Sequence, residues 1–182
     1  MITQFDFAVL DAIQAIRFPV LDKVMVFVTH LGDEGIIWIA LAVLFLCFKK
    51  TRKCGVMLGL VLISGLIVGN LGLKNLIARD SPYVQYPYLL DELLIKPLSS
   101  YSCPSGHTMS SVECAVVVFL WNKKAGIPAL ILATLIAFSR MYLYVHFLTD
   151  ILLGALIGAA LAIIVHFVYY KFMYKKIKFL GD

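Results

Sequence analysis

Five stretches of this sequence are apolar and nearly free of charge, and their length leaves few folds open to the chain. They span residues 35–48, 54–73, 104–122, 125–139 and 151–170, and Glu113 is the single Asp, Glu, Lys or Arg residue within them. The runs 54–73 and 151–170 reach the roughly 20 residues, at about 1.5 Å each, that a helix needs to cross a bilayer core. The runs 35–48 and 125–139 are shorter and must borrow flanking residues. We therefore predict an all-α fold, a polytopic transmembrane helical bundle of five to six spans.

The composition agrees with a membrane setting. Of the 182 residues, 62% are hydrophobic and 15% are charged, whereas ordinary globular domains are about 45–50% apolar and roughly 25% charged. The excess apolar surface must face lipid, which excludes a disordered, a collagen-like or a secreted disulfide-rich chain. At this length we expect residues 1–182 to form one integral-membrane domain. The four cysteines have neither metal-ligand nor redox spacing, so we expect them to pack as small apolar side chains.

The first 32 residues differ from the rest of the chain. Asp11, Arg17, Asp22 and Lys23 interrupt two short helical patterns, which break at Pro19. We predict that residues 1–32 form an amphipathic N-terminal segment of interfacial helices, and a sixth crossing there stays open. The segment has no basic region ahead of an apolar core, so we do not expect a cleaved signal peptide. The helical bundle itself is expected over residues 33–174.

The distribution of basic residues predicts the orientation of the bundle, because Lys and Arg near short loops are retained in the cytoplasm. If five spans alternate, ten of the sixteen basic residues fall on one face: Lys49, Lys50, Arg52, Lys53, Lys123, Lys124, Lys171, Lys175, Lys176 and Lys178. The opposite face receives Lys74, Arg79, Lys96 and Arg140. We therefore predict a multi-pass cell-membrane protein with an extracytoplasmic loop at 79–103. The topology also accounts for the net charge of +5, so no nucleic-acid partner is expected.

Two of the four cations on the predicted outer face lie next to apolar runs, and one of the predicted helices begins on the same face. A charge at membrane depth costs about 2.5–3.5 kcal/mol on insertion scales, so Lys74 and Arg140 must either snorkel to the surface or pair with an anion. The sequence Pro104-Ser105-Gly106-His107 begins the third run. Pro104 suits a first helical turn, and Gly106 allows a ligand to approach the backbone. The free N–H groups of such a helix start attract anions, and His107 would touch whatever binds there.

A second polar group shares this face. His146 and Asp150 are four residues apart, so they are neighbours on one helix face, with about 5–6 Å between their Cβ atoms. The carboxylate can then accept the Nδ1–H of the imidazole and leave Nε2 unprotonated, as a nucleophilic or basic histidine requires. Alternatively, the pair only neutralises two polar groups inside the membrane. A metal site of His107, His146 and Asp150 is a further alternative, weakened by the adjacent cations.

Taken together, three cations, a helix N-terminus and two histidines describe a phosphate pocket. The cations neutralise the phosphate oxygens, one imidazole attacks phosphorus, and the other protonates the departing oxygen.

A transporter that relays protons through His and Asp is an alternative function of another class, and it predicts polar residues through the full depth of the bundle. His30 and His166 have no motif neighbour, so we assign them to interface or packing roles. Glu113 is expected to form an interhelical hydrogen bond; alternatively, it faces the pocket.

The residues Pro104-Ser105-Gly106-His107, followed by Ser139-Arg140, His146 and Asp150, resemble the second and third signature motifs of the type 2 phosphatidic acid phosphatase superfamily. The resemblance covers about Lys74 to Asp150 and points to the membrane lipid phosphatases of that superfamily. It implies His146 as the nucleophile that forms a phosphohistidine, Asp150 as its orienting partner and His107 as general acid. The phosphate ligands that it implies are Lys74, Ser105, Gly106 and Arg140, with no metal or other cofactor.

The first motif departs from the superfamily pattern, in which a Lys is followed by six residues and then by Arg-Pro. Here Ser81 stands in the place of the arginine, and Arg79-Asp80 precede it. The change removes one forked phosphate donor and puts a carboxylate near an anion site. Two outcomes follow from it. In the first, Arg79 swings in as a substrate-binding residue and the enzyme is active but weakened; in the second, the protein binds lipid phosphates with little or no turnover.

The leading hypothesis is an integral-membrane hydrolase of a lipid phosphomonoester or diphosphate on the outer leaflet, with the bilayer and its lipid-phosphate substrate as partners. Undecaprenyl diphosphate, phosphatidic acid and phosphatidylglycerophosphate present the same head group to such a pocket. We expect selectivity to reside in the 79–103 loop, with the side chains Tyr83, Tyr86, Tyr88, Asp91 and Glu92. The sequence does not specify an oligomeric state.

Overall fold

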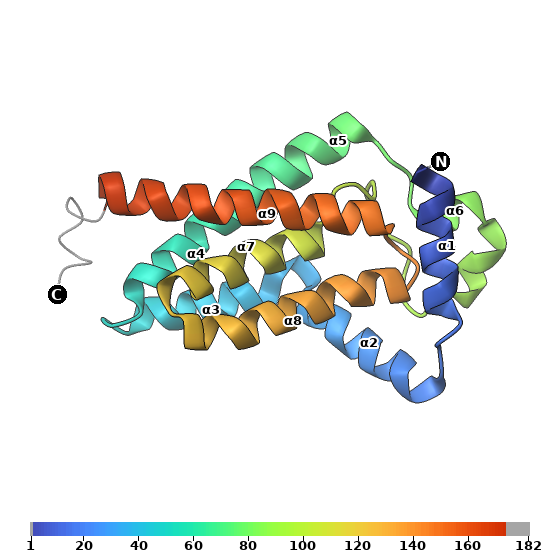
Figure 1. Ribbon diagram of the computed structural model, residues 1–182, viewed down its shortest axis with the longest axis horizontal. Helices are drawn as coiled ribbons and strands as arrows, with labels where there is room; N and C mark the ends of the chain where they lie inside the picture. The colour runs from blue at the N-terminus through green and yellow to red at the C-terminus, as the bar shows by residue number, and fades with distance from the viewer. Residues whose placement is uncertain (1, 174–182) are drawn as a thin grey trace.

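The computed structural model describes residues 2–173, except for the side chains of residues 2 and 87–89, and every regular element in that range is a helix (Figure 1). The prediction of an all-α fold is confirmed. The elements are α1 (Ile2–Gln14), α2 (Pro19–Leu31), η1 (Asp33–Gly35), α3 (Ile36–Cys47), α4 (Arg52–Gly65), η2 (Leu66–Leu73), α5 (Lys74–Ile77), α6 (Pro82–Gln85), η3 (Pro87–Glu92), α7 (Gly106–Trp121), α8 (Lys123–Tyr142), α9 (Leu148–Val168) and η4 (Tyr169–Met173).

All five apolar runs are helical, but fewer of them are long enough to span a bilayer than we expected. Three helical stretches qualify by length and hydropathy: Arg52–Gln85, which is interrupted between α5 and α6, Lys123–Tyr142 and Leu148–Met173. A fourth span is possible if Pro19–Leu31 and Asp33–Cys47, which meet at a bend of 45°, are counted as one. The described residues thus support three or four spans by this measure, and the count of five to six stays a prediction. Helix α7 has 16 residues, about 24 Å at 1.5 Å per residue.

Helix α7 can be short because protein surrounds it. It lies in the middle of the bundle and packs against α4, α8 and α9 (Figure 1). Two glycines of α9 allow a close approach, since a Cβ at Gly158 would lie 2.6 Å from the carbonyl oxygen of Met109, and one at Gly154 would lie 2.9 Å from that of Ser105. No larger residue fits there without separating the helices. This contact fixes the start of α7 beside the start of α9.

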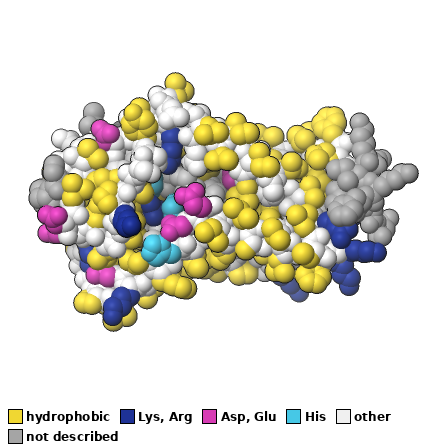
Figure 2. Space-filling view, turned by 180° about the vertical axis from the view of Figure 1, so that it is seen from behind, with side chains coloured by type: hydrophobic (Ala, Val, Ile, Leu, Met, Phe, Trp, Pro, Cys, Tyr) yellow, Lys and Arg dark blue, Asp and Glu magenta, His cyan; other side chains and the backbone are white. Residues whose placement is uncertain are grey.

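The surface is divided into a broad apolar band and two polar ends (Figure 2). The exposed hydrophobic side chains of α3 and α9 include Ile39, Val43, Leu152, Leu156 and Ile163. The α3–α4 and α7–α8 turns lie at the same end of the bundle, which places the basic residues of both turns together, as the topology prediction requires (Figure 1). Lys175, Lys176 and Lys178 lie outside the described residues. The assignment of this end to the cytoplasm stays a prediction.

The N-terminal segment covers the opposite end. Helix α1 lies across the bundle there and contacts α8 and α9 (Figure 1). The side chains of Asp6 and Leu10 on this helix are completely buried. Helix α2 leads into α3 through the short turn η1, where Glu34 and Gly35 have positive φ angles of 49° and 68°. The N-terminal segment therefore contributes residues to the interior, although its sequence carries no recognisable motif.

Candidate active site

A cavity of about 670 Å³ opens between the start of α7 and the helices α3, α4 and η2. Its polar end contains five of the predicted site residues: Lys74, Gly106, His107, Arg140 and His146. Its other end is lined by aliphatic side chains of α3 and α4, among them Ile39, Val43, Leu46, Leu62 and Ile63. The structure therefore joins a cluster of cations and imidazoles to an apolar passage.

Arg140 supplies a buried positive charge to the polar end. Its side chain is 1% exposed, and Nη1 donates a hydrogen bond of 2.5 Å to Oγ1 of Thr29. Nε and Nη2 have no hydrogen-bond partner among the described residues. An unpartnered buried guanidinium edge is costly, and an anion in the cavity would satisfy it.

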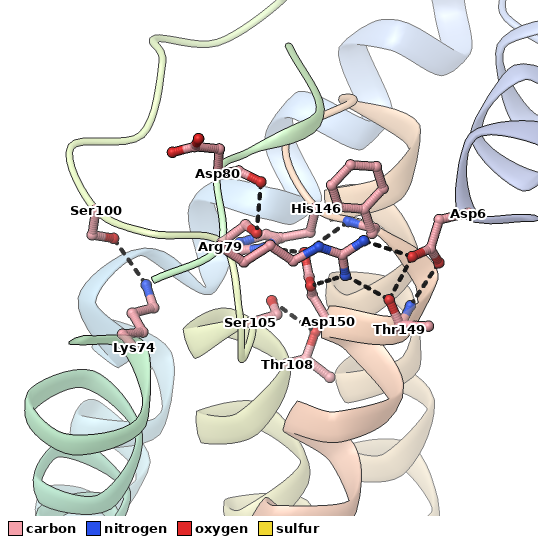
Figure 3. Close-up of polar contacts among 12 residues, drawn as sticks. Asp6, Lys74, Arg79, Asp80, Ser100, Ser105, Thr108, His146, Thr149 and Asp150 are labelled. Atoms are coloured by element: carbon pink, nitrogen blue, oxygen red, sulfur yellow. Dashed lines mark hydrogen bonds and ion pairs between the residues drawn. The ribbon is translucent and has the colours of Figure 1, made fainter. Parts of the chain in front are cut away.

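Lys74 approaches the same cavity from the first turn of α5, which continues from the π-helical η2. Its Nζ donates a hydrogen bond of 2.9 Å to Oγ of Ser100, a residue of the 79–103 loop (Figure 3). The hydroxyl partner is neutral, so the ammonium charge is not cancelled by this contact.

The start of α7 differs slightly from the expected arrangement. The helix begins at Gly106 with Ser105 as N-cap, so the expectation that Pro104 lies in the first turn is wrong. The Ser105 N–H donates to the carbonyl oxygen of Asp150 at 3.2 Å, and its hydroxyl accepts a hydrogen bond from Thr108 Oγ1 at 3.1 Å. The N–H groups of the first helical turn have no intrahelical acceptor. They therefore add hydrogen-bond donors at the polar end of the cavity.

His107 has a carboxylate partner that the sequence did not reveal. Its Nε2 lies 2.8 Å from Oδ1 of Asp33, which belongs to the turn η1, and the other oxygen of Asp33 lies 2.6 Å from Nδ1 of His30. His30 was assigned to an interface or packing role, and the structure places it in this exposed hydrogen-bonded pair. No local spacing predicts the contact between Asp33 and His107, because these residues are 74 positions apart in the chain.

His146 and Asp150 lie together as predicted, but their contact is long. Nδ1 of His146 is 3.7 Å from Oδ2 of Asp150, and this nitrogen has no hydrogen-bond partner among the described residues. Catalytic hydrogen bonds are often long before substrate binds.

His146 lies in the short connection between α8 and α9. Burial lowers the pKa of its imidazole to about 4 from the ordinary value of 6.5, and the charges of Arg140 and Lys74 act in the same direction, against Asp150. The imidazole is therefore neutral at physiological pH.

Arg79 is not brought to the cavity. Its Nη1 donates to Asp150 Oδ1 at 2.7 Å and to Thr149 Oγ1 at 2.6 Å, and its Nη2 donates to Asp6 Oδ2 at 2.7 Å (Figure 3). Arg79 is absent from the cavity lining. The expectation that Arg79 substitutes for the missing phosphate ligand is thus without support from its position, and Asp6 is a partner that sequence reasoning missed.

Ser81, at the position of the missing arginine, is 3% exposed. It lines a neighbouring cavity of about 460 Å³ that shares Lys74, Asn70 and Ser100 with the first one. The gap in the first motif therefore corresponds to unfilled space beside Lys74.

The 79–103 loop contributes to the cavity through different residues from those we expected. Leu98, Ser99 and Ser100 line the cavity. Tyr83 instead supports the loop, since its hydroxyl accepts a hydrogen bond of 2.8 Å from the Leu98 N–H, and the ring of Tyr86 packs edge-on against Phe7. The side chain of Tyr88 lies outside the described part of the chain.

Glu113 also differs from expectation. It lines the cavity, but Oε2 is buried without a hydrogen-bond partner among the described residues, so the expected interhelical hydrogen bond is not formed by that atom.

Within residues 2–173, no three His, Cys, Asp or Glu side chains come together in a group that could hold a metal ion. The alternative of a metal site at His107, His146 and Asp150 is thus without geometric support.

Comparisons with known proteins agree with these motifs. A family model described as the PAP2 superfamily matches residues 53–174. An undecaprenyl-diphosphatase of Sulfolobus acidocaldarius is 34% identical over 146 residues, which cover 79% of this chain and 68% of that protein. A phosphatidylglycerophosphatase B of Bacillus subtilis is 32% identical over 174 residues, which cover 88% of this chain and 81% of that protein.

A solved structure is similar over nearly the same range. The crystal structure of a transmembrane PAP2-type phosphatidylglycerolphosphate phosphatase from Bacillus subtilis superposes with a TM-score of 0.75 at 29% sequence identity. The match covers 93% of this chain and 87% of the other. The helical arrangement is therefore shared with a membrane lipid phosphatase, and the match includes most of the N-terminal segment.

Proposed function

Because this chain belongs to the PAP2 superfamily, we propose that it is an integral-membrane lipid phosphatase that cleaves a phosphomonoester or diphosphate through a phosphohistidine. The relatives named above support a lipid phosphatase of PAP2 type. The observation that carries the proposal is the buried guanidinium of Arg140, which has two unpartnered donor atoms and lies in one cavity with His107 and His146.

The phosphate would bind between the cations and the start of α7. Arg140 offers Nε and Nη2, Lys74 offers its ammonium group, and the first N–H groups of α7, at Gly106 and His107, supply further donors. Ser105 is the N-cap residue of this helix, and it is buried and absent from the cavity lining. Each donor is fixed before substrate arrives, so little reorganisation is needed as charge develops on the phosphate oxygens.

The neutral imidazole of His146 attacks phosphorus through Nε2, because Nδ1 faces Asp150. An N–P bond forms while the bond from phosphorus to the leaving oxygen breaks, and His107 gives that oxygen a proton. In the second step His107 takes a proton from water, whose oxygen attacks phosphorus and breaks the N–P bond. Phosphate leaves and both histidines return to their starting states. No metal ion takes part in this scheme.

The lipid tail would leave the site sideways. Aliphatic residues of α3 and α4 line the cavity beyond the polar end, so a tail can lie between these helices while the phosphate rests near His146. The apolar passage suits the lipid tail of any of the three substrates considered above, which are undecaprenyl diphosphate, phosphatidic acid and phosphatidylglycerophosphate. We place the site on the extracytoplasmic face, in agreement with the clustering of basic turns at the other end.

A second candidate is a weakly active or inactive family member that binds lipid phosphates. The observation that favours it is Ser81, which leaves empty space where a cation is expected. Tight binding of lipid phosphate without phosphate release would establish this alternative.

The test is phosphate release by the purified protein in detergent with undecaprenyl diphosphate, phosphatidic acid and phosphatidylglycerophosphate as separate substrates. We expect release from at least one of them, and loss of that release in His146→Ala. An inactive wild type that still binds lipid phosphate would favour the second candidate, and full activity in His146→Ala would exclude the proposed mechanism.

A further inference from the structure

A cluster of charged side chains lies next to His146 but outside the cavity lining. It consists of Asp6 of α1, Arg79 at the start of the 79–103 loop, and Thr149 and Asp150 in the first turn of α9 (Figure 3). The side chains of Asp6 and Asp150 are completely buried. The roles described so far include Asp150 but give no task to Asp6 or to Arg79.

The two oxygens of Asp150 have different partners. Oδ1 accepts a hydrogen bond of 2.7 Å from Arg79. Oδ2 accepts one of 3.0 Å from the N–H of Phe147 and is the oxygen that faces His146 at 3.7 Å. A carboxylate held at both oxygens cannot rotate freely, so Arg79 and the Phe147 N–H together keep Oδ2 directed at the imidazole.

Arg79 is itself fixed from three sides. Its guanidinium carbon lies 3.9 Å from the centre of the Phe147 ring, a cation–π distance. Nη1 is shared between Asp150 and Thr149, and Nη2 is bound by Asp6. The forked group thus joins two carboxylates, with both N–H groups of Nη1 and one of Nη2 donated to neighbouring side chains. This use of the fork explains why Arg79 does not take the place of the arginine absent at position 81.

Asp6 anchors the arrangement from the N-terminal helix. One carboxylate oxygen accepts from the N–H of Thr149 at 3.1 Å, and the other accepts from the Thr149 hydroxyl at 2.6 Å and from Arg79 at 2.7 Å. A carboxylate at the first turn of a helix satisfies a free N–H and favours the positive end of the dipole. Asp6 therefore fixes Arg79 and the start of α9 at the same time.

We propose that Asp6 and Arg79 are positioning residues for the nucleophile, acting in series from α1 through Arg79 to the Asp150 carboxylate and so to His146. The inference rests on the proposed phosphatase function and adds a role for the N-terminal helix. Neither residue touches the substrate.

The experiment measures kcat, KM and the inhibition constant of inorganic phosphate for Asp6→Asn, Asp6→Ala, Arg79→Lys and the double variant Asp6→Ala/Arg79→Lys. We expect each single variant to lower kcat about 10- to 100-fold, the loss typical of partners that orient a functional histidine. The inhibition constant of phosphate should stay within about twofold, because neither side chain lines the cavity. The double variant should lose little more than Arg79→Lys alone, since residues in one chain of contacts are not additive.

The matched control is Asp11→Asn. Asp11 also lies on α1 and accepts a hydrogen bond of 3.0 Å from Tyr144 Oη in the α8–α9 connection, but it contacts neither Arg79 nor Asp150. We expect wild-type kcat for this variant. If Asp6→Ala does not fold, as judged by thermal unfolding in detergent, Asp6→Asn keeps the size of the side chain and decides the question.

Three results would overturn the inference. Wild-type kcat in a folded Asp6→Asn or Asp6→Ala protein would remove Asp6 from the chain of contacts. A tenfold weaker inhibition by phosphate in Arg79→Lys would show that Arg79 is a phosphate ligand. An equal loss in Asp11→Asn would show a general effect of α1 docking. A wild type that releases no phosphate from any substrate would instead remove the proposed function and this inference with it.

Discussion

Oδ1 of Asp33 lies 2.8 Å from Nε2 of His107, and this contact joins the turn between α2 and α3 to the start of α7. A carboxylate beside an imidazole stabilises the protonated ring, which is the form that a general acid needs. His107, which would donate a proton to the leaving group, is therefore hydrogen-bonded to Asp33, a residue that belongs to no sequence motif.

The Asp33–His107 contact predicts a dependence on the leaving group. Asp33→Asn should lower kcat about 10- to 100-fold for an alkyl phosphate, the loss typical of a partner that orients a functional histidine. It should change the hydrolysis of p-nitrophenyl phosphate by less than about threefold, because that leaving group needs little protonation. Rates with both substrates check the prediction, and His30→Ala, which removes only the exposed partner of Asp33, serves as control. Equal losses with both substrates would contradict the acid role.

Arg140 predicts opposite effects on activity and stability. Arg140→Met keeps a similar volume and removes a buried charge with unpartnered donors, so we expect phosphate release to fall at least 100-fold while Tm rises by about 2–4 °C. Activity and thermal unfolding in the same detergent test this. A lower Tm would mean that the buried charge is compensated in the free protein.

Ser81 offers a gain-of-function test. The empty space of about 460 Å³ beside Ser81 and Lys74 can take a larger side chain, so Ser81→Arg should bring a forked cation next to the phosphate. One charge-assisted hydrogen bond contributes roughly 1.5–3 kcal/mol, which corresponds to a rise in kcat/KM of about tenfold or more. Ser81→Gln is the uncharged control. No gain in a folded Ser81→Arg protein would show that the gap in the first motif does not limit activity.

The pKa of His146 predicts how the free protein responds to acid. Because burial lowers the pKa of this ring to about 4, the unfolded chain binds a proton near pH 6.5 that the folded protein does not bind until about pH 4. Stability should therefore fall as the pH drops from about 6.5 to 4. NMR of ¹⁵N-labelled histidines, assigned with His146→Ala, should show a ring that stays neutral at pH 5.5. A midpoint near 6.5 for this signal would contradict the burial of the neutral ring.

The scheme without a metal predicts that chelators leave the rate unchanged. Phosphate release measured after dialysis against EDTA should remain within about twofold of the untreated protein, and added Mg²⁺ or Zn²⁺ should not raise it. A rate that falls with EDTA and returns with one of these ions would place a metal in the reaction.

The sequence predicted the parts of the site that lie close together in the chain. The helix start at Ser105-Gly106-His107 and the His146–Asp150 pair follow from local spacing, and the structure brings both into contact with one cavity or its border. Lys74 and Arg140 were recognisable because a cation next to an apolar helix costs free energy at membrane depth and is usually retained for a function.

The remaining features depend on contacts between distant segments. Asp6 and Asp33 carry no motif, and their partners lie 73 and 74 residues away, so no periodicity could identify them. The two outcomes left open for Arg79 could not be separated for a related reason, since its guanidinium is bound by Asp6 and Asp150, which lie 73 and 71 residues away in the chain. The close packing of α7 against Gly154 and Gly158 likewise joins segments that are far apart in the sequence.

The most direct test of the central claim is to trap the covalent intermediate on His146. The protein is mixed with a ³²P-labelled lipid phosphate, quenched in alkali within the first turnover, and digested for peptide mapping. We predict a phosphoryl label that is stable in base, labile in acid and confined to the peptide containing His146, with no label in His146→Ala. A wild type that turns over without carrying the label, or a label that persists in His146→Ala, would contradict the mechanism.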